Sequence, residues 1–201
     1  MHNYFPNYYG YGVRQVSTAG WTPSKVELNR KLRSLWEQHI FWTSLTVNSI
    51  VDDLPEQKET IARLFRNPAD FAAVLDVHYP PVVADKFADL FRGHLTLATE
   101  WVTTLHKGDS AAAEEVQKRW YANANDIAVF LGKINPYWST AEWRNMLFEH
   151  LRLLTSKVMT RIEGNYAQNV LANDLIEPQA LGMADAMTMG IIRQFPMAFQ
   201  S

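Results

Sequence analysis

Four long stretches of the sequence repeat apolar side chains at the three- and four-residue spacing of a single helix face. They cover about residues 25–52, 81–106, 110–133 and 139–163. In the second stretch, Phe87, Leu90, Leu97 and Trp101 fall on one stripe. Such a stripe predicts an amphipathic helix, because it turns one side of the helix toward a core. No stretch shows the alternation of apolar and polar residues that is typical of a half-buried strand.

Residues that begin or end helices separate these stretches. Prolines at positions 55, 80, 81 and 136 mark breaks, and Gly108 and Gly164 are typical of helix C-termini. Two pairs, Ser24 with Glu27 and Ser139 with Glu142, have the spacing of a capping box. We also expect two short helices, at about 56–66 and beginning at Asn67-Pro68, and a last helical region at about 166–194 that bends near Pro178.

The pattern predicts an all-α protein. Helices of similar length joined by short connections pack side by side in alternating directions. We therefore expect an antiparallel up-down four-helix bundle with two short extra helices and a C-terminal helix. A chain of 201 residues suits one domain, here residues 23–201.

Residues 1–22 have a composition of their own, rich in Tyr, Gly and Asn. This segment has neither a helical period nor strand alternation, so we expect an irregular tail. It is interpreted either as a mobile end or as an arm that lays its tyrosines on its own domain or on a partner. The second interpretation predicts binding to a protein partner, or self-association, through the tail.

Composition excludes several classes of function. The chain has no cysteine, which rules out disulfides, thiolate metal sites and a cysteine nucleophile. The formal charge is −2 and the pI is about 6.3, so we expect no nucleic-acid partner. No run of 18 apolar residues or secretory signal occurs, so we expect no membrane insertion and a soluble cytoplasmic protein. Phosphate-loop, dinucleotide-binding and serine-hydrolase motifs do not occur.

A short phrase recurs in three of the predicted helices. In each copy a bulky apolar residue lies three positions before a histidine, and Ile or Leu follows it, which singles out His39, His94 and His150. A related phrase, Trp120-Tyr121-Ala122-Asn123, has Asn in place of His. All four polar residues fall on apolar stripes near the middle of their helices. Because midpoints of similar helices meet at one level, we expect one polar layer in the core.

The layer has three interpretations. One is a buried hydrogen-bonded network, which helps to fix helix register. Another is a site for a divalent transition metal such as Zn or Fe, held by His39, His94 and His150 with Asn123 or Asp126 nearby. Asp126 lies one turn from Asn123, and Asp185 is a second candidate acid. A third is a small-molecule pocket in the core lined by Trp36, Trp101, Trp120 and Trp143.

Several phrases resemble a bacterial family of small helical proteins without an established role. They are Leu35-Trp36-Glu37-Gln38-His39 with Phe41-Trp42-Thr43, Arg66-Asn67-Pro68-Ala69-Asp70, Trp120-Tyr121-Ala122-Asn123, Ile134-Asn135-Pro136-Tyr137-Trp138, and Met183-Ala184-Asp185 with residues 190–196. The resemblance implies one helical domain and a bacterial origin, with the spore as an alternative location. Some members are named acetylglutamate kinase, but such a kinase needs an α/β sheet with glycine-rich loops, and residues 21–201 hold six glycines.

These observations together predict a non-enzymatic helical bundle with a binding or assembly role. The alternative is a metal-binding, ferritin-like bundle. Against the alternative stands the shortage of carboxylates, because di-iron bundles use Glu-x-x-His pairs and none occurs here.

Overall fold

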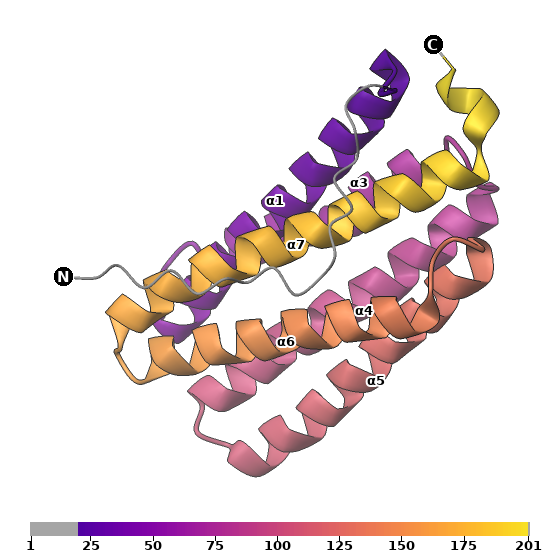
Figure 1. Cartoon of the computed structure of the whole chain (residues 1–201). Coiled ribbons are helices and arrows are strands. Elements are labelled where there is room, and N and C mark those ends of the chain that lie inside the picture. The colour runs from indigo at the N-terminus through magenta and orange to yellow at the C-terminus, as the bar shows by residue number, and fades with distance from the viewer. Residues whose placement is uncertain (1–19, 201) are drawn as a thin grey trace, which may run out of the picture.

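The computed structural model describes residues 20–200, and all of its regular structure is helical (Figure 1). The helices are α1 (Pro23–Val51), α2 (Gln57–Leu64), α3 (Asn67–Leu75), α4 (Pro81–His106), α5 (Ser110–Ile134), α6 (Thr140–Ile162), α7 (Tyr166–Gln194) and the 3₁₀ helix η1 (Pro196–Phe199). The all-α prediction is confirmed, with element boundaries close to the expected ones. The expected irregular tail lies outside the described residues except for positions 20–22.

Five long helices close into a ring, where a four-helix bundle was expected. Going round the ring, α1 packs on α7, α7 on α6, α6 on α5, α5 on α4, and α4 returns to α1. The C-terminal helix α7 is therefore a full wall of the core, between α1 and α6, and not an addition to its outside. Its buried side explains this position, since Ile176, Met183 and Met187 have almost no exposed surface.

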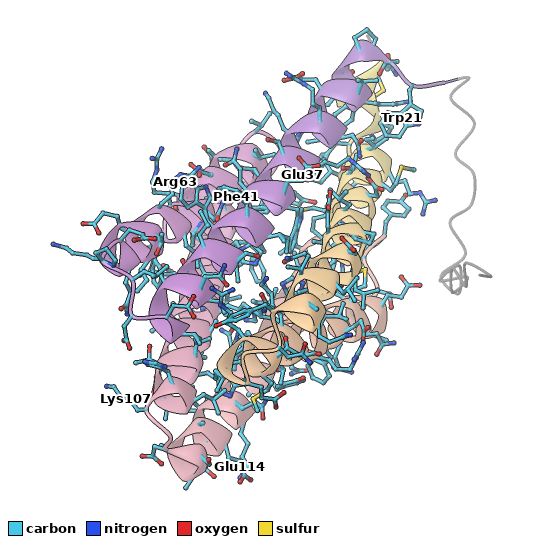
Figure 2. The ribbon with its side chains drawn as sticks, turned by 90° about the vertical axis from the view of Figure 1, so that its left-hand side faces the viewer. Trp21, Glu37, Phe41, Arg63, Lys107 and Glu114 are labelled. Carbon is cyan, nitrogen blue, oxygen red and sulfur yellow. The ribbon has the colours of Figure 1, made fainter. Side chains whose placement is uncertain are left out.

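An odd number of helices cannot alternate in direction all the way round a ring. Asp53, just after α1, bonds His106 at the end of α4 at 3.2 Å, so these two helices end side by side, near the labelled Lys107 (Figure 2). The chain enters α1 beside Phe199, where Thr22 Oγ1 donates to the Phe199 carbonyl at 2.9 Å. Neighbours from α4 to α7 run antiparallel, but α1 and α4 run the same way (Figure 1). Helix α3 packs on both members of this parallel pair.

Local signals at the helix ends explain where the helices begin. Ser139 accepts a bond from the Glu142 amide at 3.3 Å, as its predicted capping position requires. At α1 the cap is Thr22 and not Ser24, because Thr22 Oγ1 accepts from the Lys25 amide and Pro23 occupies the first helical position. Among residues 20–200, none of the helices combines the length and the apolar character that a membrane crossing needs.

Candidate functional site: a polar layer in the core

Each of the five long helices contributes one polar side chain to the middle of the core. These side chains, here called the polar layer, are His39 on α1, His94 on α4, Asn123 on α5, His150 on α6 and Gln179 on α7. The three histidines are only 3–4% exposed. The predicted layer is therefore present, with one member, Gln179, that the sequence analysis did not single out.

His94 uses both ring nitrogens in hydrogen bonds to α5. The indole N–H of Trp120 donates to His94 Nε2 at 3.1 Å, so Nε2 is the unprotonated nitrogen. The proton then lies on Nδ1, which donates to Asn123 Oδ1 at 2.9 Å. The Asn123 amide is fixed in turn, because its Nδ2 donates to the Leu90 carbonyl at 3.2 Å. His94 is thus a neutral imidazole with no free nitrogen.

His150 is oriented by α7. Its Nδ1 lies 2.8 Å from Gln179 Oε1, and Gln179 Nε2 donates to the Met146 carbonyl at 2.8 Å. Because the amide nitrogen is committed to that carbonyl, Gln179 Oε1 accepts the proton of Nδ1. The sequence holds a signal for Gln179, which follows Ile176 by three residues and precedes Met183 by four. Pro178, near which the sequence predicts a bend, lies inside the continuous helix α7.

His39 has no such partner. Its Nδ1 is buried without a hydrogen bond, and the same holds for Trp36 Nε1 and for the hydroxyls of Thr43 and Thr46. All four atoms belong to one stripe of α1. The His39 ring lies 5.7 Å from the His150 ring, centre to centre, and 5.2 Å from Phe91. Both ring nitrogens of His94 and the Nδ1 of His150 are therefore hydrogen-bonded, whereas the Nδ1 of His39 is not.

Burial keeps all three imidazoles neutral. It lowers the pKa of His94 to about 4, although the bond to Asn123 opposes part of this shift. Burial also lowers the pKa of His39 well below its ordinary value, and repulsion from a charged His150 or His94 lowers it further. For His150 burial again lowers the pKa, against the raising effect of Gln179. No charged form is stabilised in the layer, because the acids predicted beside it lie elsewhere.

The expected metal ligands do not assemble around one point. Asp126 is exposed, and Asp185, half exposed, pairs with Arg33 at 2.7 Å. His94 and Asn123 bond each other. Within residues 20–200 no group of three or more His, Asp or Glu side chains is arranged to hold a metal ion. Of the proposed ligands, His39 and His150 have neighbouring rings, 5.7 Å apart centre to centre.

Two small cavities flank the polar layer, and all three histidines line both. Each measures about 20 Å³. One continues toward Phe87 and Trp143, the other toward Thr46 and Ile50. Pockets for small molecules measure roughly 300–1,000 Å³. Of the four tryptophans predicted to line a ligand pocket, Trp36 and Trp143 line one small cavity and Trp120 lines the other. Trp101 stacks on Trp120 in the core, with ring centres 5.5 Å apart.

Comparisons with protein-family models, curated proteins and solved structures find no match to this chain. The resemblance to a bacterial family of small helical proteins therefore stays a prediction.

Proposed function

We propose that this chain is a non-enzymatic helical bundle with a binding role, and that it binds an amphipathic partner segment carrying basic side chains at the end of the bundle where α6 meets α7. Two features of the core support the non-enzymatic part. Both ring nitrogens of His94 and the Nδ1 of His150 are engaged by side chains of the protein itself. The cavities beside them are too small for a substrate.

The observation that carries the proposal is the clustering of exposed apolar side chains. Twelve large apolar side chains are exposed among residues 20–200, and six of them lie between positions 159 and 175. We call these six the α6–α7 apolar surface: Met159, Ile162, Tyr166, Val170, Leu171 and Leu175. Scattered exposed apolar residues are normal, whereas a concentration of them is typical of an interaction site.

The first half of α7 carries apolar side chains outside its buried side as well. Asn169, Ala172 and Ile176 face the core. Leu171 and Leu175, one turn apart on the solvent-facing side, are 51% and 41% exposed. A helix that served only to cover its own core would carry polar residues on that outer side. The outer side is thus suited to a second apolar surface.

Charge selects the kind of partner. Three exposed carboxylates, those of Glu163, Asp174 and Glu177, flank the apolar surface, and none forms an ion pair with a described residue. Two cations lie near this surface: Arg161 pairs with Asp52 and covers the Tyr166 ring, and Lys157 donates to Asn173. A second copy of this surface would set acids against acids, which opposes self-association. A partner with lysines or arginines around an apolar face complements both features.

Binding to a model partner tests the proposal. The probe is a helix-forming peptide of leucine and lysine with one apolar face, and its control replaces each lysine with glutamate. Fluorescence anisotropy should detect binding of the lysine peptide only. The double variant Leu171→Ser, Leu175→Ser should weaken this binding about tenfold or more, because tenfold corresponds to only ~1.4 kcal/mol of lost apolar contact.

Val82→Ser is the matched control, because Val82 is 72% exposed at the opposite end of the bundle. It should leave peptide binding unchanged. Equal binding of both peptides, or binding that survives the double serine variant, would overturn the proposal. Sedimentation of the wild-type chain adds a further check: a dimer that dissociates in the serine variant would replace the basic partner with a second copy.

A metal-binding bundle is the second candidate function, now restricted to His39 and His150. The observation in its favour is the 5.7 Å between these rings, together with the bond from His150 Nδ1 to Gln179, which leaves Nε2 as the free nitrogen. Two imidazoles on one ion about 2 Å from each nitrogen lie at a comparable spacing. Elemental analysis of untagged protein loaded with Zn²⁺ tests this candidate. Retention of zinc that is lost in His150→Leu supports it, and no retention removes it.

A further inference from the structure

The stripe of unpartnered polar atoms on α1 runs along the cavity that continues toward Ile50. His39, Thr43 and Thr46 all line this cavity. Their positions four and three residues apart place them on successive turns of one helix face. His39 Nδ1, Thr43 Oγ1 and Thr46 Oγ1 are each buried without a hydrogen bond. Three unpartnered groups in one place are unusual, since buried polar atoms almost always have partners.

We propose that this cavity is a binding site for one water molecule, held by the Thr43 and Thr46 hydroxyls, which lie one turn apart on α1. The volume fits, because a cavity needs about 10–15 Å³ to hold a water, and this one measures about 20 Å³. Two hydroxyls suffice as partners, because a buried water makes about two to four hydrogen bonds. A larger polar ligand does not fit in this volume, which Val47, Leu95 and Leu154 also bound.

The other cavity differs in its lining. Beyond the three histidines it is bounded by apolar side chains, with Phe87, Phe91 and Leu147 among them. Trp36 Nε1 is its single additional unpartnered group. A water there would lack the hydroxyl pair on which the proposed site depends. The proposed water therefore occupies the cavity lined by Thr43 and Thr46 and forms hydrogen bonds with α1.

The double variant Thr43→Val, Thr46→Val tests the site, because valine keeps the shape of threonine and removes the hydroxyl. Oxygen-17 relaxation dispersion counts water molecules with long residence times inside a protein. The wild-type chain should show one such water more than the double variant. The double variant should also have a lower Tm, since it loses hydrogen bonds to bound water.

Thr188→Val is the matched control. Thr188 is fully buried and its hydroxyl donates to the Ala184 carbonyl at 2.8 Å, away from the cavity. It should lower the Tm and leave the number of long-lived waters unchanged. The proposal is wrong if the double variant keeps every long-lived water, or if its Tm rises, because removing two hydroxyls that lack any partner stabilises a protein.

Discussion

The indole N–H of Trp120 donates to Nε2 of His94 across 3.1 Å, and this bond decides what His94 can do. The nitrogen that would bind a metal or take up a proton is already an acceptor for a buried donor. Trp120 and Asn123 lie three residues apart on one face of α5, so both reach the same imidazole. His94 is thereby a structural histidine, in contrast to His39 in the same layer.

The same substitution at these two positions should have unequal costs. His94→Leu leaves the Trp120 N–H and the Asn123 carbonyl without partners, so it should lower the free energy of unfolding by about 2–4 kcal/mol. His39→Leu leaves no side chain without a hydrogen-bond partner, so it should lower the free energy of unfolding clearly less than His94→Leu does. Urea unfolding of both variants measures the difference. Equal costs would show that the bonds of His94 contribute nothing to stability.

Acid should destabilise the fold as the pH falls below about 6.5. The pKa values of all three core histidines are lowered in the folded chain, that of His94 to about 4, whereas the unfolded chain binds protons near 6.5. The histidines therefore stabilise the fold fully above about pH 6.5, and this contribution is lost as the pH falls toward 4. Each of the three histidines should contribute at most about 1.4 kcal/mol per pH unit to the slope of the unfolding free energy with pH.

Urea midpoints between pH 4.5 and 7 measure that slope, and His94→Leu is the informative variant. This variant should lower the slope of the unfolding free energy with pH by the contribution of one imidazole. That decrease is expected whatever the variant does to stability at pH 7. A wild-type chain with a flat profile over this range would contradict the neutral, buried state of the layer.

Two glycines in α7 should respond oppositely to alanine. A Cβ at Gly190 would collide with the indole of Trp138, whose N–H bonds the Ala186 carbonyl at 3.1 Å. Gly190→Ala should therefore cost about 1–3 kcal/mol. At Gly182 the space is open, so Gly182→Ala should stabilise the helix by about 0.5–1 kcal/mol. Thermal unfolding distinguishes the two, and a destabilised Gly182→Ala would show that this face of α7 is covered.

Asn123 and Asp126, one turn apart on α5, should also differ. Asn123→Ala removes the acceptor for His94 Nδ1 and should cost about 1–3 kcal/mol. Asp126→Ala should change stability by less than about 0.5 kcal/mol, because Asp126 is exposed. Chemical unfolding at neutral pH gives both values. A large loss of stability in Asp126→Ala would show that Asp126 interacts with the polar layer after all.

The sequence predicts the elements of this fold well and their arrangement less well. Apolar stripes and proline breaks locate every long helix, because both act within a few residues. The position of α7 depends on which helices its buried side contacts. The apolar stripes alone do not show this, because they could be buried equally well in a ring of four helices or of five. The sequence predicts a cap at Ser24, because Ser24 and Glu27 have the spacing of a capping box, whereas Thr22 holds that position.

The candidate site shows the same limit. The phrases around His39, His94 and His150 are alike, and they do place all three imidazoles in the core. Their hydrogen bonds depend on α5 and α7, which turn Trp120 and Asn123 toward His94 and Gln179 toward His150. His39 lacks such a hydrogen-bond partner, and the residues around it in the sequence do not indicate this. The acid predicted beside the layer, Asp126, lies a turn away but on the exposed side of α5.

The parallel contact between α1 and α4 has a consequence for how the chain opens. Their ends cannot be joined by a short loop, so the sides of α1 and α4 are bridged by the short helix α3. Opening of this contact requires α3 to leave both helices, and amide exchange should be slower in α3 than in α2, because Phe71 and Leu75 of α3 are fully buried. His39 and His94 stand on the two helices that this opening would separate. The parallel contact between α1 and α4 is thus the place where local opening would expose the polar layer to solvent.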